Sequence, residues 1–106
     1  MSILTFEGIG IRAIAASVPK NIAKTEEQTK FFDKKHLKNF IENTGIYERR
    51  VSSVNQTSSD FCCKAAEIIF EKTGFNKEEI QALIFVSQTP DYRQPATSII
   101  MQDRLH

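Results

Sequence analysis

The stretch that decides the fold is Gln81–His106, QALIFVSQTPDYRQPATSIIMQDRLH. It begins with a continuous apolar run, Ala82–Val86, which is too short for an independent helix and contains neither glycine nor proline. Such a run is typical of a strand that is buried on both faces in a parallel or mixed sheet. A polar loop, Ser87–Pro95, follows it. Pro95 suits the first turn of a helix, whose buried side we expect at Ile99, Ile100 and Leu105.

The loop Ser87–Pro95 is the most promising place for a ligand site. Open α/β sheets bind ligands beyond the carboxyl ends of their strands, where a loop leads into a helix. This loop is longer than the usual connection of that kind, which favours a function, and an ordinary solvated loop is the alternative interpretation. Its hydrogen-bonding side chains are Ser87, Gln88, Thr89, Asp91, Tyr92, Arg93 and Gln94.

The first third of the chain alternates between extended and helical patterns. Gly8–Ser17 predicts a strand with one buried face, formed by Ile9, Ile11, Ala13 and Ala15. Pro19–Asn21 predicts a turn. Thr25 and Gln28 resemble a capping box, which predicts a short helix over Glu26–Phe32. Asp33 caps a second helix that Gly45 ends, with Leu37, Phe40 and Ile41 on one side.

The middle of the chain predicts an extended segment and the clearest helix. Ile46–Ser53 is expected to be extended. A capping box of Thr57 and Asp60 starts the helix, Gly74 ends it, and the buried stripe is Phe61, Ala65, Ile68 and Ile69. Asn76 caps a further turn before the last strand. This alternation predicts an α/β fold, a mixed sheet with flanking helices, in a single segment spanning residues 1–106.

Composition excludes several classes of protein. The chain has 106 residues, of which 25% are charged and 41% are hydrophobic, so a globular domain is expected. A net charge of +1 with interspersed signs provides no footprint for nucleic acid or an anionic membrane. No apolar run approaches a membrane span, and the N-terminal stretch lacks the pattern of a secretion signal. We expect a protein of the cytoplasm.

The residues that most often perform chemistry give weak signals here. Cys62 and Cys63 lie in the first turn of the predicted helix, where a thiolate would be stabilised. Cys62 falls beside the apolar stripe, however, so core packing is the favoured interpretation and a reactive thiol the alternative. His36 and His106 form no metal spacing, and no metal or other cofactor is expected. Arg49 and Arg50 point to opposite faces of an extended segment, so at most one can face an anion.

Four segments, taken together, carry a resemblance to a known family. They are IRAIAASVPKN at 11–21, NTGIYERRV at Asn43–Val51, TSSDFCCKAAEIIFEKTG at Thr57–Gly74 and IQALIFVSQTPDYRQPATSIIMQDRL at Ile80–Leu105. Their order and spacing resemble the N-terminal part of the β-ketoacyl-acyl carrier protein synthase III family, in the thiolase superfamily. The resemblance implies an incomplete N-terminal half of the layered α/β/α/β/α fold of thiolases.

The resemblance also implies an activity. Family members condense an acyl-CoA primer with malonyl-acyl carrier protein, losing carbon dioxide, at the start of fatty acid synthesis. Their nucleophilic cysteine follows the helix that here ends at Leu105, and a histidine and an asparagine come later. None of the three matches a residue of this chain, so it is expected to be a piece that is inactive alone. It would contain no catalytic residue, and the full-length enzyme would be a homodimer.

Four positions match substrate-binding features of the family. Asn39 and Asn43 stand where many members carry an aromatic residue that stacks on the CoA adenine and an arginine near its phosphates, with Thr44 beside them. Gln94 matches a residue that helps to bound the partner subunit's acyl pocket. Two alternatives remain: a non-catalytic module for carrier-protein binding or dimerisation, and a related synthase of secondary metabolism.

Overall fold

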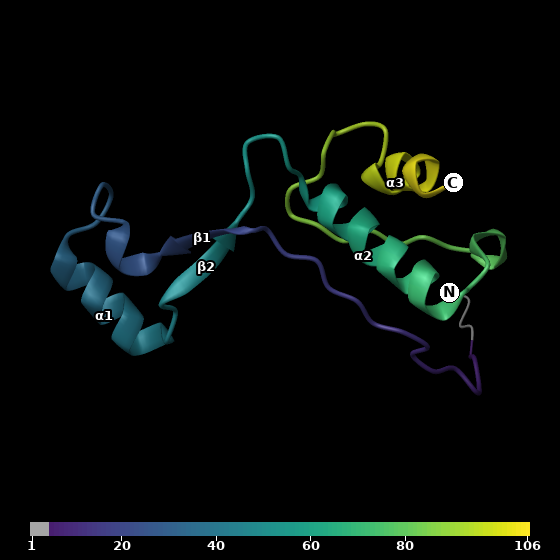
Figure 1. Cartoon of the computed structure of the whole chain (residues 1–106), viewed down its shortest axis with the longest axis horizontal. Coiled ribbons are helices and arrows are strands. Elements are labelled where there is room, and N and C mark those ends of the chain that lie inside the picture. Colours follow the sequence, from purple (N-terminus) through teal and green to yellow (C-terminus); the bar gives the residue numbers. More distant parts are fainter. Residues whose placement is uncertain (1–4) are drawn as a thin grey trace.

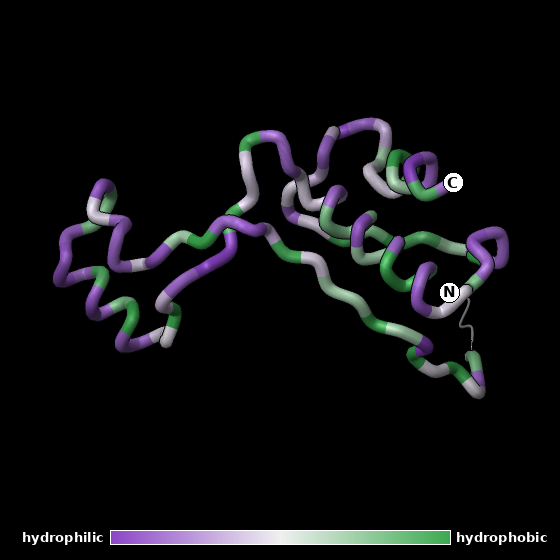
Figure 2. The backbone as a smooth tube through the Cα atoms, viewed as in Figure 1, coloured by the Kyte–Doolittle hydropathy of each residue, from purple (hydrophilic) through white to green (hydrophobic). Residues whose placement is uncertain are grey.

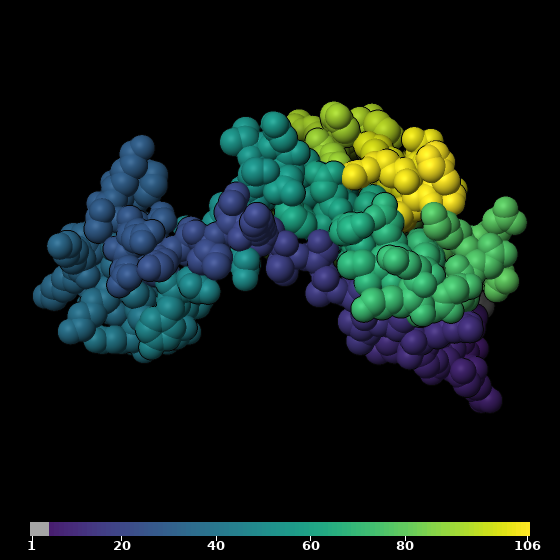
Figure 3. Space-filling view, viewed as in Figure 1, coloured from purple at the N-terminus to yellow at the C-terminus, as the bar shows by residue number. Residues whose placement is uncertain are grey.

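The computed structural model describes residues 5–106 and has an elongated α/β architecture. Residues 1–4, the beginning of the N-terminal stretch considered above, lie outside the described residues. The radius of gyration is 18.8 Å and the extents are 52 × 33 × 32 Å. A compact chain of about 100 residues would have a radius of about 13 Å. Figures 1 and 3 show the reason: two groups of elements lie at opposite ends and are joined by extended chain.

The first group is built on a small antiparallel ladder. Strand β1 (Asn21–Lys24) pairs with β2 (Glu48–Val51), so that Asn21 faces Val51 and Lys24 faces Glu48. The extended conformation expected for 46–53 is confirmed at β2, whereas the turn expected at 19–21 is wrong at Asn21, which begins β1. The ladder explains the difference, since pairing with β2 keeps Asn21 extended.

The helix expected over Glu26–Phe32 is reduced to one 3₁₀ turn, η1 (Thr25–Glu27). The expected capping box does not form, because the Thr25 hydroxyl donates instead to the carbonyl oxygen of Ile46 at 2.8 Å. That contact joins residues 21 positions apart in sequence, which no local pattern reveals. A long-range hydrogen bond therefore replaces the local cap.

Helix α1 (Lys34–Thr44) begins and ends where the sequence predicts. The Asp33 carboxylate accepts from the backbone N–H of His36 at 2.9 Å. Gly45 closes the helix in the left-handed region, at φ 69°, where a side chain is disfavoured. The expected apolar side is covered only in part, because Leu37 is 6% exposed while Phe40 is 45% exposed.

The second group is formed by α2 (Ser58–Thr73), the 3₁₀ turn η2 (Lys77–Glu79) and α3 (Thr97–Leu105). The capping box of Thr57 and Asp60 and the terminating glycine, Gly74, are confirmed for α2. Asn76 caps η2 by accepting from Glu78 N–H at 3.2 Å. The buried core consists of Cys63, Met101 and Leu105, with Ala66, Phe70, Leu83 and Phe85 packed against it.

The core lies on a different side of α2 from the one expected, and on α3 the expected side is confirmed at Leu105 but not at Ile99. The expected stripe of α2, Phe61, Ala65, Ile68 and Ile69, is only half-buried, and Cys63 is buried instead. On α3, Thr97, Met101 and Leu105 are buried, whereas Ile99 is exposed. The cause is that α2 and α3 pack on each other, and the i, i+4 series of α3 meets the Cys63 side of α2.

The first and last of the expected strands are extended but have no strand partner among the described residues. These segments are 8–17 and 82–86. The expectation that Ala82–Val86 is buried on both faces is wrong, because Leu83 and Phe85 are half-buried while Ile84 and Val86 are more than 80% exposed. In 8–17, Ala13 and Ala15 are half-buried but Ile9 and Ile11 are exposed. The exposed faces thus carry apolar side chains, Ile9, Ile11 and Ile14 in one segment and Ile84 and Val86 in the other. Figure 2 shows hydrophobic residues along both segments.

Candidate functional site

The loop singled out in the sequence is fastened to the first turn of α2. Ser58 Oγ lies 3.2 Å from Ser87 Oγ and donates to the carbonyl oxygen of Thr89 at 3.0 Å. Ser59 Oγ donates to Asp91 Oδ2 at 2.5 Å. The backbone N–H of Asp91 in turn donates to Thr97 Oγ1, at the start of α3, at 3.2 Å. The loop is therefore held between the N-terminal turns of two helices.

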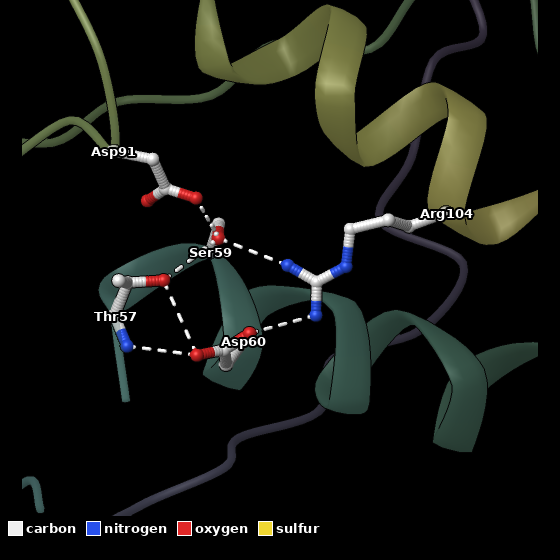
Figure 4. Close-up of polar contacts among 5 residues, drawn as sticks. All are labelled: Thr57, Ser59, Asp60, Asp91 and Arg104. Atoms are coloured by element: carbon white, nitrogen blue, oxygen red, sulfur yellow. Dashed lines mark hydrogen bonds and ion pairs between the residues drawn. The ribbon is translucent and has the colours of Figure 1, made fainter. Parts of the chain in front are cut away.

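An ion pair fastens the far end of α3 to the same turn of α2 (Figure 4). Arg104 Nη2 lies 2.7 Å from Asp60 Oδ1, and Arg104 Nη1 donates to Ser59 Oγ at 3.1 Å. The hydrogen bond from the Thr57 backbone N–H is the main cause that lowers the pKa of Asp60, and Arg104 lowers it further. Both side chains remain more than a third exposed, so solvent screens the pair.

A groove of about 930 Å³ is formed by the same group of elements. Its walls are the extended segment 80–86, helix α3 and one side of α2, and its apolar lining residues include Leu83, Phe85 and Met101. Lys77 closes one end, where its Nζ donates to the Leu105 carbonyl oxygen at 2.6 Å and lies 5.4 Å from the centre of the Phe70 ring. The groove is thus mostly apolar, with a cation at one end.

The two cysteines have different environments. Cys63 is 4% exposed and belongs to the core, and desolvation raises the pKa of its thiol, which disfavours the thiolate. Cys62 is exposed and lines the groove, so the expectation that Cys62 packs in the core is wrong. The reason is the rotation of the buried face of α2 described above, which turns Cys63 inward in its place.

No cluster of metal-ligating side chains occurs within residues 5–106, and no helix there is long and apolar enough to cross a membrane. His36 Nδ1 lies 2.7 Å from Asp33 Oδ2 on an exposed helix start. Arg50 Nη1 donates to the carbonyl oxygens of Pro19 and Lys20, at 3.4 and 3.1 Å. Arg50 therefore holds the chain that leads into β1.

The expected substrate-binding residues are all exposed. Asn39 and Asn43 lie one turn apart on α1, and Gln94 lies in the loop that precedes α3. The Thr44 hydroxyl donates to the Phe40 carbonyl oxygen at 2.7 Å and accepts from Ile46 N–H at 3.2 Å. Figure 1 shows α1 at one end of the molecule and the loop before α3 in the other half. The chain does not bring Gln94 together with the residues of α1.

Sequence reasoning missed Ser59 and Arg104, and it did not indicate that they contact Asp91 and Asp60. Asp91 was recognised as one polar residue of the loop, and Asp60 as a helix cap, but nothing in their spacing indicates Arg104, which is 44 positions from Asp60. Ser59 is 0% exposed, and no local pattern distinguishes it from Ser58 beside it, which is half-buried. The cluster is created by the packing of α3 on α2.

Comparisons with known proteins agree on one family. The β-ketoacyl-[acyl-carrier-protein] synthase III of Latilactobacillus sakei is 37% identical over 92 residues, which cover 86% of this chain and 27% of that protein. The synthase III of a Sulfurovum species is 34% identical over 95 residues, covering 89% of this chain and 28% of that protein. A scan against protein-family models found no match.

The structural comparison points the same way. A crystal structure of a 3-oxoacyl-(acyl-carrier protein) synthase from Burkholderia xenovorans LB400 superposes with a TM-score of 0.80 at 34% identity. It covers 87% of this chain, which spans 27% of that structure. The α/β arrangement described above therefore matches part of a thiolase-like synthase. The chain corresponds to a segment of β-ketoacyl-acyl carrier protein synthase III, the family that its motifs predicted.

Proposed function

We propose that this chain is the N-terminal segment of a 3-oxoacyl-acyl carrier protein synthase III-like acyltransferase. The single observation that carries the proposal is the TM-score of 0.80 at 34% identity with a synthase of that name, over 87% of the chain. Identity at this level extends the likeness from fold to family, and the curated relatives agree with it. The comparisons favour neither a separate carrier-protein-binding module nor a synthase of secondary metabolism.

The proposed reaction of the whole protein is a decarboxylative Claisen condensation. A cysteine thiolate takes the acyl group from acyl-CoA and releases CoA. Malonyl-acyl carrier protein then loses carbon dioxide, and the resulting enolate attacks the acyl thioester and expels the cysteine. In this chain neither cysteine is paired with a histidine within residues 5–106, because Cys63 is buried in the core and His36 contacts Asp33. The segment alone would therefore be inactive.

The contribution of the segment would be substrate binding and support of the active site. Asn39 and Asn43 present two exposed amides on α1 toward the CoA of the full-length enzyme, and Gln94 bounds an acyl pocket across a homodimer. The Thr44 hydroxyl is engaged with backbone groups, which supports a role in shaping the end of α1. The protein would act in the cytoplasm with acyl-CoA and malonyl-acyl carrier protein as its substrates, without nucleic acid or membrane.

An assay of the longer protein that contains this segment tests the proposal. The purified protein, given acetyl-CoA and malonyl-acyl carrier protein, is expected to release CoA and carbon dioxide in equal amounts and to form 3-oxoacyl-carrier protein. The 106-residue chain alone is expected to do neither. Sedimentation of the longer protein should give a dimer. Absence of condensation with every acyl-CoA offered would refute the proposal.

A further inference from the structure

Ser59 occupies a central position in the cluster that joins the two helices to the loop (Figure 4). Its side chain is 0% exposed, and three polar groups surround its hydroxyl oxygen. Arg104 Nη1 lies at 3.1 Å, Thr57 Oγ1 at 3.0 Å and Asp91 Oδ2 at 2.5 Å. A buried hydroxyl with three such neighbours has one donor and two acceptor positions to assign.

The chemistry of two neighbours, Arg104 and Asp91, fixes the direction of their hydrogen bonds to Ser59. A guanidinium can only donate, so Arg104 donates to Ser59. A carboxylate can only accept, so the Ser59 proton lies on the bond to Asp91. Thr57 Oγ1 lies 3.0 Å from Ser59 Oγ and also lies 3.3 Å from Asp60 Oδ2, so its proton can be shared with either oxygen. The donation thus runs in one direction, from Arg104 through Ser59 to Asp91.

Asp91 depends on this contact for its placement. Its other carboxylate oxygen, Oδ1, is buried and has no hydrogen-bond partner among residues 5–106. Its backbone N–H donates to Thr97 Oγ1, and Thr97 is only 4% exposed. A carboxylate in such a setting is costly to leave unpaired, because burial of a charge without hydrogen bonds is unfavourable. Ser59 therefore determines where the middle of the loop lies.

We propose that Arg104 is a positioning residue which, acting through Ser59, fixes Asp91 and with it the loop Ser87–Pro95 that presents Gln94. The two ends of the guanidinium have separate tasks. Nη2 holds α3 to Asp60, while Nη1 orients the hydroxyl that anchors the loop. The consequence for acyl selectivity rests on the proposed function, since it requires Gln94 to bound an acyl pocket.

The hydrogen bonds from Arg104 to Ser59 and from Ser59 to Asp91 form the proposed relay. Amide hydrogen exchange in the 106-residue chain tests this relay without any measurement of enzymatic activity. The probes are the backbone amides of Asp91 and Thr89, which donate to Thr97 Oγ1 and Ser87 Oγ. In Ser59→Ala, exchange at Asp91 is expected to quicken roughly tenfold, because the carboxylate loses its donor. Exchange along α2 and α3 should stay within about twofold of the wild type, since the Arg104–Asp60 pair remains. Uniform acceleration across both helices, or no change at Asp91, would overturn the proposal.

A double-mutant cycle separates a relay from two independent contacts. Arg104→Met is expected to quicken exchange at Asp91 by a similar factor and, unlike Ser59→Ala, to raise the pKa of Asp60 in a carboxyl titration. The double variant should add no further acceleration at Asp91, because both changes break the same path. Independent, multiplicative effects would contradict the relay. Lys64→Met is the matched control, since it removes a cation paired at 3.1 Å with Glu67 on α2 alone, and it should leave Asp91 unaffected.

The full-length protein provides the functional readout. Ser59→Ala is expected to change the ranking of acyl-CoA chain lengths by KM in the same direction as Gln94→Ala, with a smaller change in kcat. A Ser59→Ala enzyme whose ranking is unchanged, while its loop exchanges faster, would refute the link to acyl selectivity. If the protein catalyses no condensation at all, the proposed function fails, but the exchange results still decide the relay.

Discussion

The hydroxyl of Thr25 donates to the carbonyl oxygen of Ile46 at 2.8 Å and joins the end of β1 to the chain that follows α1. The backbone N–H of Thr25 also donates to the neighbouring Tyr47 carbonyl oxygen at 2.8 Å. Thr25 is only 2% exposed, so the donor side of both contacts is buried. One threonine thus closes the loop that contains the whole of α1.

Replacing Thr25 tests this closure. Thr25→Val keeps the shape of the side chain but leaves the Ile46 carbonyl oxygen without its donor, which should cost about 1–3 kcal/mol of unfolding free energy. Thr25→Ser retains the hydroxyl and should cost less. Urea denaturation of the two variants measures the difference, and equal stability of Val and Ser would show that the hydroxyl contributes nothing.

Gly45 should be the more sensitive of two glycines that have open space around them. A Cβ at Gly45 or at Gly10 would meet no atom within 4 Å, but only Gly45 has a positive φ, 69°. Gly45→Ala should therefore destabilise the chain by about 1 kcal/mol through backbone strain alone. Gly10→Ala is the matched control and should be neutral or slightly stabilising in the same denaturation experiment. A loss of equal size at both positions would contradict this explanation.

Acid should weaken the contact between α2 and α3. The Thr57 N–H and Arg104 hold the pKa of Asp60 below its ordinary value of 3.8. The unfolded chain then binds the proton more readily, so the contribution of Asp60 is present above about pH 4 and is lost as the pH falls through the folded pKa. The difference in stability between wild type and Asp60→Asn should shrink steadily on acidification below that pH. A difference independent of pH would show that the charge of Asp60 plays no part.

The two thiols should differ sharply in reactivity. Cys62 is exposed, whereas Cys63 is 4% exposed and burial raises the pKa of its thiol. At mildly alkaline pH, iodoacetamide should modify one thiol quickly and the second only after unfolding. Mass spectrometry of Cys62→Ser identifies the site, because that variant should lose the fast reaction. Rapid modification of Cys63 in the folded chain would contradict the packing described here.

Restoring the residues that many family members carry should strengthen CoA binding in the longer protein. Asn39→Trp adds a ring that can stack on adenine, and Asn43→Arg adds a cation for the phosphates. Each change is expected to lower the dissociation constant of CoA by roughly tenfold, from about 1–3 kcal/mol of added interaction. Calorimetry measures it, with Lys38→Trp, an exposed neighbour on α1, as the control. No gain from either change would remove α1 from the proposed CoA site.

The predictions that held depend on a few neighbouring residues. Asp33, Gly45, Thr57 and Gly74 act within one turn of the helix that each begins or ends, so their positions in the sequence are sufficient. The predictions that failed depend on partners far along the chain. Thr25 donates a hydrogen bond to Ile46, which is 21 positions away. Cys63 is buried because α3 packs on that side of α2.

The candidate site divides in the same way. Composition indicated that the loop Ser87–Pro95 is unusually polar, and the structure shows two of its side chains, Ser87 and Asp91, in contact with α2. The residues that fasten it, Ser59 and Arg104, have no distinguishing pattern, because their roles exist only once α2 and α3 are packed. Helical periodicity identifies apolar faces, but it does not reveal which polar residues meet when two helices cross.

The alternation along 82–86 has a consequence for strand alignment. Leu83 and Phe85 face the helices, while Ile84 and Val86 face away, and both sets are apolar. Sliding this segment by one residue would exchange one apolar pair for the other at little cost in burial, so hydrophobic patterning does not fix its register. The register is instead distinguished at the polar end, where Ser87 and Thr89 meet Ser58. Ser58, at the start of α2, thereby fixes how the segment beside it is aligned along the helix.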